Sequence, residues 1–191
     1  MIDEIKVFDD IIDKKLQDKL EEKLLSDKFA WYYCDDVSVK GNKHQQRPAF
    51  KHHCVLNREI RSPLHYEIMP IIINSLKKVN YKSPEFVKCV QGRSFLQVPL
   101  HMPDADTVDT PHVDLLYPHL VVLYYVVDNE ASTIIYENKF KKGNIPEWED
   151  LKEKQRVTPK KGRVVVFNGE HWHTAEQPRK KTRCVINYDV I

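Results

Sequence analysis

The sequence lacks long apolar runs, and none of its hydrophobic stretches approaches the roughly 18 residues that a membrane-spanning helix needs. Its opening, MIDEIKVFDD, is acidic, whereas a signal peptide begins with basic residues and continues with apolar ones. We therefore expect a cytoplasmic protein without a membrane partner. Basic residues are dispersed and the net charge is only +2, which argues against a nucleic-acid partner and gives no indication of oligomeric state.

Cysteine is scarce, and internal repeats, low-complexity tracts and Gly/Ser linkers are absent. The four cysteines (Cys34, Cys54, Cys89 and Cys184) lie far apart, without the paired spacing of a zinc site or a disulfide framework. We expect reduced thiols. With 191 residues, 41% of them hydrophobic and 30% charged, the chain fits one soluble globular domain over residues 1–191.

Two stretches of the N-terminal half have helical periodicity. Leucines recur every fourth residue from Leu16 to Leu24, which predicts an amphipathic helix over about residues 13–26. A second helix is predicted over about residues 62–79, where Ser62 can cap the first turn and Pro63 suits its first position. The apolar stripe of the second helix consists of Leu64, Ile68, Ile72 and Leu76.

The chain from about residue 85 to its end consists of short runs rich in Val, Ile, Tyr and Phe, such as HLVVLYYVV and TRCVINYDVI, separated by Pro, Gly, Asn and Asp. Short strands without helices between them predict a sandwich or a jelly roll. The expected fold is thus mainly β, with helical support over about residues 1–80 and a jelly-roll core over about 85–191. The polar stretch 137–156 is expected to be a loop with a short helical turn near PEWEDLKEK.

An H-x-D pair, HVD, occupies residues 112–114. Residues two apart in extended backbone point to the same side, so His112 and Asp114 can offer a nitrogen and an oxygen to one first-row divalent metal ion. The pair alone is a weak signal, because Asp114 could instead cap backbone amides in a polar turn. A third ligand could come from His171 or His173 in EHWHTAEQPRKKTR. Two histidines and one carboxylate are the ligands of non-haem iron(II) oxygenases.

Four features follow one another along the chain: HVD at 112–114, VVLYYVVD at 121–128, FNGEHWH at 167–173, and Arg183 ten residues beyond His173. Over about residues 85–191 the chain resembles the iron(II)- and 2-oxoglutarate-dependent oxygenases, in particular their prolyl-4-hydroxylase-like branch. The resemblance implies a double-stranded β-helix, the jelly roll of cupin-like proteins. The family's G-G-x-T turn is replaced by DNEASTIIYE, in which only Thr133 matches.

The resemblance implies that His112, Asp114 and His173 bind Fe(II), with His171 as the rival ligand and otherwise a solvent-facing residue at the mouth of the site. Four further residues are expected to bind the cosubstrate 2-oxoglutarate: Arg183, Tyr125, Gln97 and Asn187. Arg183 would pair with its far carboxylate. Tyr125 faces inward on its strand, Asn187 shares the face of Arg183, and Gln97 takes an inward position on the SFLQV strand.

The activity that the resemblance implies is that of a dioxygenase. It would use Fe(II), 2-oxoglutarate and O2 to hydroxylate an unactivated C–H bond and release succinate and carbon dioxide, with ascorbate as a candidate accessory reductant. A prolyl or peptidyl substrate is favoured by the branch, and a small molecule remains an alternative. Two other functions are weighed: a non-catalytic jelly-roll binding module, and a cupin-like metalloenzyme that does not use 2-oxoglutarate. The binding module predicts that at least one of the three metal ligands, or Arg183, is missing. The cupin-like metalloenzyme predicts no basic residue after His173.

Two N-terminal features complete the expectations. The polar segment from about Lys40 to His53, KGNKHQQRPAFKHH, contains glycine and proline and is predicted to be a mobile loop beside the mouth of the site. The motif KHHC at residues 51–54 resembles a cluster of metal ligands. Adjacent histidines on an early segment, however, more often lie on a solvated face.

Overall fold

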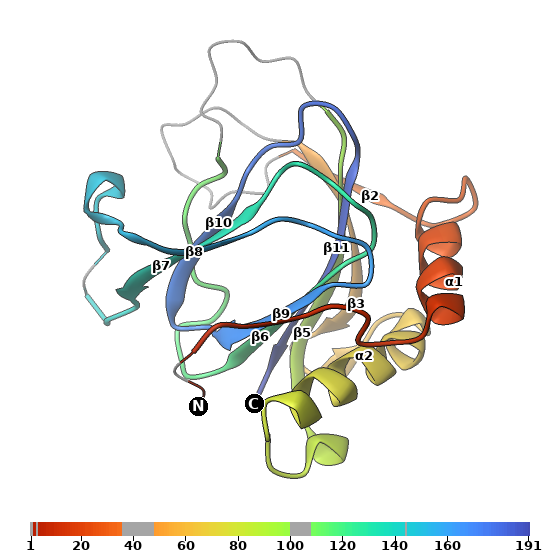
Figure 1. Cartoon of the computed structure of the whole chain (residues 1–191), viewed down its shortest axis with the longest axis horizontal. Coiled ribbons are helices and arrows are strands. Elements are labelled where there is room, and N and C mark those ends of the chain that lie inside the picture. The colour runs from red at the N-terminus through yellow and green to blue at the C-terminus, as the bar shows by residue number, and fades with distance from the viewer. Residues whose placement is uncertain (1, 3, 36–47, 100–107, 144) are drawn as a thin grey trace.

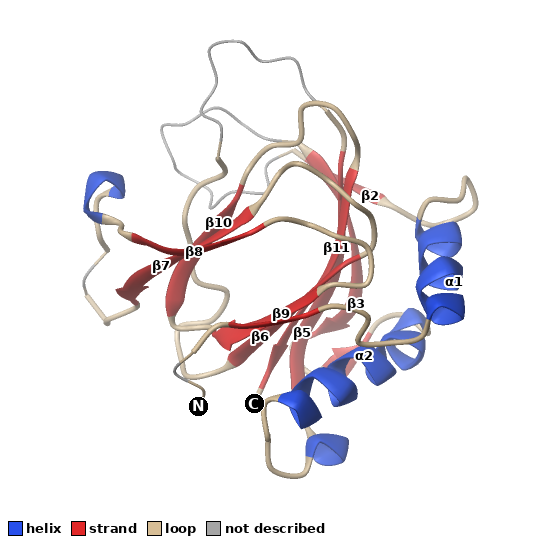
Figure 2. Cartoon of the chain, in the orientation of Figure 1, coloured by secondary structure: helices blue, strands red, loops and turns tan. Residues whose placement is uncertain are grey.

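The structure is a computed structural model that describes the chain except residues 1, 3, 36–47, 100–107 and 144. Within the described residues, antiparallel strands form a larger sheet of eight strands and a smaller sheet of three (Figures 1 and 2). The larger sheet has the order β1-β9-β6-β11-β5-β3-β2, with β4 beside β3, and the smaller sheet has the order β10-β7-β8. The prediction of a mainly β jelly roll with helices in the N-terminal half is confirmed.

The elements have the following bounds. The strands of the larger sheet are β1 (Lys6–Phe8), β2 (Tyr32–Cys34), β3 (Ala49–Leu56), β4 (Glu59–Ile60), β5 (Cys89–Gln97), β6 (Leu120–Tyr125), β9 (Val164–Asn168) and β11 (Arg183–Val190). The strands of the smaller sheet are β7 (Thr133–Lys139), β8 (Glu153–Val157) and β10 (His171–Ala175). The helices are α1 (Lys14–Leu24) and α2 (Leu64–Lys78), with short 3-10 helices η1 (Pro84–Phe86) and η2 (Trp148–Asp150). Among the described helices, none is both long and apolar enough to cross a membrane.

Both predicted helices are present, within about two residues of the expected ends. The side chain of Asp13 accepts a hydrogen bond from the amide of Leu16 at 2.8 Å, which caps α1. At the start of α2 the amide of Leu64 donates to the hydroxyl of Ser62 at 3.3 Å. The helices cover one face of the larger sheet, which we call the outer face (Figure 1).

The strand β6 divides its side chains between two hydrophobic clusters. Val122 and Tyr124 belong to the cluster that includes the buried leucines and isoleucines of α1 and α2. Val121, Leu123 and Tyr125 belong to the second cluster, on the opposite face of the sheet, which we call the inner face. The predicted alternation is thus confirmed. The larger sheet therefore has one face covered by helices and one face turned toward the smaller sheet.

The structure has strands in two regions where none was predicted. In the stretch 137–156 the helical turn is confirmed at Trp148–Asp150, but β7 continues to Lys139 and β8 begins at Glu153. The prediction missed β8 because its sequence, EKQRV, is mostly polar and exposed, as an edge strand tolerates. Four strands, β1 to β4, also precede residue 80, where only helical support was expected.

The prediction of a mobile loop from Lys40 to His53 is wrong for its last residues. Residues 40–47 lie outside the described part of the chain, but Ala49–Leu56 is β3, an interior strand between β2 and β5. Its neighbours His52 and His53 point to opposite faces, and Cys54 is fully buried. The motif KHHC is therefore not a solvated face. Pairing on both sides makes this segment a strand, although the polar residues KHH interrupt its apolar ones.

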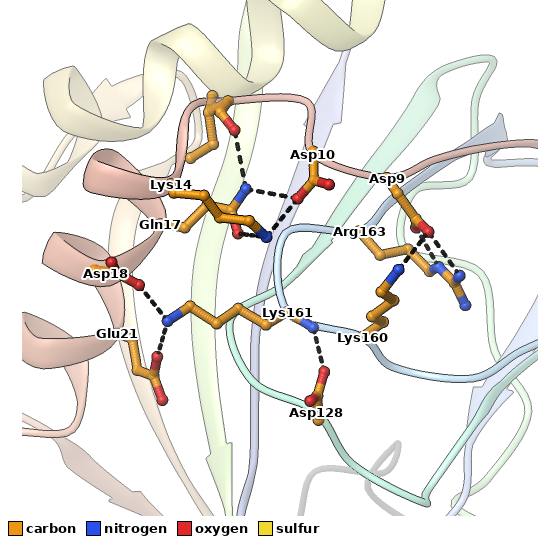
Figure 3. A network of polar contacts seen from close by, with 11 residues as sticks. Asp9, Asp10, Lys14, Gln17, Asp18, Glu21, Asp128, Lys160, Lys161 and Arg163 are labelled. Atoms are coloured by element: carbon orange, nitrogen blue, oxygen red, sulfur yellow. Dashed lines mark hydrogen bonds and ion pairs between the residues drawn. The ribbon is translucent and has the colours of Figure 1, made fainter.

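A polar network ties α1 to the turn between β8 and β9 (Figure 3). Arg163 donates to Asp9 at 2.7 Å, and Lys161 contacts Asp18 at 2.5 Å. Such exposed ion pairs each contribute little. The buried amide of Gln17 is more specific, since it donates to the carbonyl of Ile12 at 2.9 Å and to Asp10 at 3.0 Å.

Gly162 generates a prediction about stability. Its φ of +81° is disfavoured for other residues, and an added Cβ would lie 2.5 Å from the amide oxygen of Gln17. The Gly162→Ala variant should lose about 1–2 kcal/mol from the backbone conformation. Displacing Gln17 should cost about 1 kcal/mol more for each hydrogen bond that is lost. Chemical denaturation measures the total.

Gly143→Ala is the matched control. Gly143 has the same φ of +81°, but an added Cβ would meet nothing within 4 Å. Its variant should show only the backbone cost. Equal losses of unfolding free energy in the two variants would contradict the packing role given to Gln17.

Candidate functional site

His112 and His173 are held side by side by their own backbones. The amide of each donates to the carbonyl of the other, at 2.9 Å in both directions. Such a closely paired antiparallel contact sets the Cα atoms about 5.5 Å apart. Asp114 follows two residues after His112, and its Oδ2 lies 3.3 Å from Nε2 of His173. Among the described residues, these three form a cluster whose candidate ligand atoms all lie within 4.8 Å of one another.

Hydrogen bonds fix the tautomer of both imidazoles. Nδ1 of His112 lies 3.0 Å from the carbonyl oxygen of Thr110, and Nδ1 of His173 lies 3.1 Å from that of His171. A carbonyl oxygen only accepts, so each Nδ1 donates and each Nε2 keeps its lone pair. Burial, aided by the proximity of His173, lowers the pKa of His112 to about 4. His112 is therefore neutral at pH 7 and can act as a ligand.

The carboxylate of Asp114 is buried and oriented by two donors. Nη2 of Arg93 donates to its Oδ1 at 2.6 Å, and the amide of Asn187 donates to its Oδ2 at 3.1 Å. Burial by itself would raise the pKa of Asp114, but the charge of Arg93, with a smaller effect from the nearby His173, holds this pKa well below its usual value. Asp114 is therefore an ionised oxygen ligand with a fixed orientation.

Arg93 also contacts a second buried acid. The same Nη2 lies 3.0 Å from Oδ2 of Asp189, whose side chain is fully buried. Burial, and next the nearby charge of Asp114, raise the pKa of Asp189 well above its usual value. Burial thus disfavours the ionised form of Asp189, whereas Asp114, whose pKa is lowered, is the acid that Arg93 stabilises as a carboxylate.

The structure separates the two histidines of EHWHTAEQPRKKTR. A register irregularity between His171 and His173 interrupts the pairing of β10 with β7. Nδ1 of His171 lies 2.7 Å from the carbonyl oxygen of Tyr136, outside the cluster of ligand atoms. His171 is 2% exposed, so the alternative interpretation of a solvent-facing residue is also wrong.

Arg183 lies at the other end of the site, on β11, and is 5% exposed. Its guanidinium donates to the side chains of Gln97 at 2.9 Å and Thr133 at 3.0 Å, and to the carbonyl of Ala131 at 3.3 Å. Thr133 also accepts from the hydroxyl of Tyr125 at 2.8 Å. Three of the predicted cosubstrate residues, Arg183, Tyr125 and Gln97, are thus brought together, and Thr133 links two of them.

The partners of Arg183 are neutral acceptors. The ion pairs found among the described residues do not include one with Arg183, although its side chain is buried. Burial lowers the pKa of Arg183, with Tyr125 and Asp109 opposing that shift. A buried guanidinium without a closely paired acid is costly. An anion bound beside it would remove that cost, so this end of the site fits a carboxylate or a similar group.

One cavity of about 290 Å³ joins the two ends. His112, Asp114 and His173 line one end and Arg183, Gln97 and Thr133 line the other. The apolar lining includes Val121 as well as Phe95, Leu123, Phe167 and Val185. Asn187 lines the cavity at the metal-ligand end, beside Asp114, and not beside Arg183 as the sequence suggested. The four residues between Arg183 and Asn187 span roughly 13 Å of extended strand, which explains the separation.

Two imidazole nitrogens and one carboxylate oxygen fit a divalent first-row metal ion of the non-haem iron class. Sequence reasoning missed Arg93, which orients Asp114, and Asp189, which accepts from Arg93, and it gave no role to Thr133. Alternation along β11 puts Arg183, Val185, Asn187 and Asp189 on one face, and this signal could have identified Asp189. The same alternation puts Arg93 on the face of Gln97, but its contact with Asp114 could not be predicted from spacing along β5.

No protein-family model matches the sequence, and no curated protein is significantly similar to it. Solved structures do match. The non-heme alpha ketoglutarate dependent epimerase SnoN from nogalamycin biosynthesis is 11% identical, with a TM-score of 0.68 over 98% of this chain and 78% of that chain. A 2OG-Fe(II) oxygenase family oxidoreductase from Burkholderia pseudomallei is 12% identical, with a TM-score of 0.63 over 97% and 84%.

The viral collagen prolyl hydroxylase from Paramecium Bursaria Chlorella virus-1 is 12% identical, with a TM-score of 0.58 over 97% of this chain and 94% of that chain. Identities this low establish the fold alone. The chain has the double-stranded β-helix fold of the 2-oxoglutarate- and iron(II)-dependent oxygenases, prolyl hydroxylases among them.

Proposed function

We propose that the protein is an iron(II)- and 2-oxoglutarate-dependent dioxygenase that hydroxylates an unactivated C–H bond. The observation that carries the proposal is one cavity with a His-Asp-His set at one end and, at the other, a buried arginine that forms no ion pair with any described residue. The likeness to SnoN, which has been crystallised with Fe3+ and alpha ketoglutarate, supports the same choice of metal and cosubstrate.

His112, Asp114 and His173 would hold the iron. The bound iron and 2-oxoglutarate supply oxidative decarboxylation to succinate and carbon dioxide, coupled to insertion of oxygen into a C–H bond. The chain's own contribution begins with orientation. Arg93 and Asn187 hold the carboxylate of Asp114, so it does not have to reorganise when the metal binds.

The far carboxylate of 2-oxoglutarate would be bound by Arg183 and Tyr125. The two terminal nitrogens of the guanidinium can donate to the carboxylate. They would then no longer donate to the neutral oxygens of Gln97 and Thr133. The hydroxyl of Tyr125 would make the third hydrogen bond in place of its bond to Thr133. Apolar side chains between the two ends exclude water from the rest of the cosubstrate and strengthen these charged hydrogen bonds.

Both alternative functions fit the site less well. A non-catalytic binding module has no need for two imidazoles and an ionised carboxylate converging on one point. A metalloenzyme that uses no 2-oxoglutarate gives no reason for an arginine buried among neutral acceptors at the end of the same cavity. The prolyl or peptidyl substrate favoured by the sequence remains a prediction, since the similar proteins named above include both a prolyl hydroxylase and an epimerase.

The assignment of the distal ligand gives a test with the metal alone. The His173→Ala variant should lose at least tenfold in affinity for Fe(II) or Mn(II), because one of three protein ligands and its fixed tautomer are removed. Anaerobic titration, with Mn(II) followed by electron paramagnetic resonance, measures the affinity.

His171→Ala is the matched control. His171 lies two residues away and is also buried, but its imidazole contacts the carbonyl of Tyr136. This variant should keep nearly the wild-type affinity and can be checked for folding by circular dichroism. The opposite pattern, with His171→Ala losing the metal, would move the ligand assignment by two residues.

Substitution of Arg183 tests the proposed binding of 2-oxoglutarate. Hydrogen bonds to charged groups contribute about 1.5–3 kcal/mol each, so Arg183→Ala should weaken 2-oxoglutarate binding by about one to two powers of ten. Arg183→Lys should lose less, because it keeps a point charge without the fork. The measurement is a 2-oxoglutarate titration of the anaerobic iron(II) protein, followed by its charge-transfer absorption. Metal affinity, measured in the same samples, should barely change. Equal 2-oxoglutarate affinities in wild type and Arg183→Ala would falsify the cosubstrate assignment.

A further inference from the structure

The inner face of the larger sheet continues past the cavity onto β3 and β2. Both strands lie beyond β5 in the sheet order, at the end away from β1. Residues directly paired across neighbouring strands share a face. The pairing registers can therefore be followed outward from the candidate site, one strand at a time.

Two rows of inner-face residues lead from the site to β3. One row runs from Leu123 through Asn187 and Arg93 to His53. The neighbouring row runs from Tyr125 through Val185 and Phe95 to Lys51, and then to Tyr32 on β2. In the first row, Asn187 and Arg93 are the two residues that contact Asp114. His53 is thus one strand, about 4.8 Å, beyond a residue that touches a candidate metal ligand.

Lys51 and His53 are half-buried, and neither side chain has an acidic partner in the described part of the chain. No ion pair there includes Lys51, and Nδ1 of His53 is buried without a hydrogen-bond partner. Burial lowers the pKa of His53, and the cations Lys51 and Arg93 add to the effect. Arg93 differs from both, because Asp114 and Asp189 already accept from it. Lys51 and His53 therefore provide, beside the cavity, hydrogen-bond donors that are not paired with an acidic side chain of the described residues.

We propose that Lys51 and His53 form an anion subsite that receives a carboxylate or phosphate group of the prime substrate. This inference rests on the proposed function, since the subsite would place the substrate's reacting carbon toward His112, Asp114 and His173. Lys51 supplies a charge and His53 a ring N–H. Tyr32, paired with Lys51 and 62% exposed, offers an aromatic surface at the outer end of the row. The motif KHHC thereby acquires a role distinct from metal binding.

The test uses the whole protein loaded with Mn(II) and saturating 2-oxoglutarate, so that Arg183 is occupied. Isothermal titration calorimetry is run with three probes of similar size: phenyl phosphate, benzoate and neutral benzyl alcohol. At least one anion should bind and benzyl alcohol should bind more weakly, and a preference between the two anions identifies the charged group. Lys51→Met and His53→Asn should each weaken the binding of the anion about tenfold, the loss expected for one charged hydrogen bond.

Two further variants serve as controls. His52→Asn changes the adjacent histidine, which faces the helices and contacts Phe29 and the carbonyl of Ala30, so anion binding should not change. Lys51→Arg keeps the charge and should restore most of the affinity, which separates loss of charge from misfolding. The inference is overturned if no anion binds the wild type, if benzyl alcohol binds as well, or if Lys51→Met and His52→Asn behave alike.

Failure of the subsite and failure of the proposed function give different results. Metal and 2-oxoglutarate affinities are measured in the same samples, and the anion titration is repeated on metal-free protein. Loss of anion binding with intact metal and cosubstrate binding rejects the subsite alone. Absence of metal or 2-oxoglutarate binding in every sample rejects the proposed function.

Discussion

The site depends on one backbone contact, the reciprocal hydrogen bonds between His112 and His173. These bonds join two segments sixty residues apart in the chain and bring both imidazoles to one point. They also leave each Nδ1 against a backbone carbonyl, which turns both Nε2 atoms toward Asp114. The pairing of the H-x-D segment with β10 is therefore what converts a common three-residue pattern into a set of converging ligands.

Two arginines line the cavity, the part-buried Arg93 and the buried Arg183, and their electrostatic surroundings are opposite. Arg93 contacts two acids, and its charge is satisfied within the protein. Among the described residues, Arg183 donates to neutral oxygens, and its charge is available to a ligand. Burial makes this contrast energetically important, because an unbalanced charge in a low-dielectric site interacts strongly with any anion that enters. The first arginine orients the metal end of the cavity, and the second gives the other end its preference for an anion.

The two faces of the larger sheet have different roles: one packs against the helices, and the other lines the cavity. The outer face packs against α1 and α2 through an apolar cluster, while the inner face contains apolar residues near β9 and increasingly polar ones toward β3. Strand alternation allows the two faces to differ, since neighbouring residues such as Tyr124 and Tyr125 serve different faces. Changes on the inner face of β3 can therefore alter what is bound without removing a helix contact.

The sequence predicted the helices and most of the C-terminal strands because their apolar periodicity is regular. It also predicted which face Tyr125 takes, because β6 alternates without interruption. It missed β3, in which KHH interrupts the apolar residues, and β8, whose residues are largely polar. These segments are strands because neighbouring strands satisfy their backbone groups, and not because of a local preference.

Motif order and spacing in the sequence determined the candidate ligands and the arginine. Tertiary structure decided the rest: that His173 and not His171 joins His112 and Asp114, that Asn187 supports Asp114, and that Thr133 links Arg183 with Tyr125. It alone revealed Arg93, and it alone placed His53 beside it. Spacing along a chain fixes only which residues of one strand share a face, whereas contact between strands depends on register, and register is set by the packing of the whole sheet.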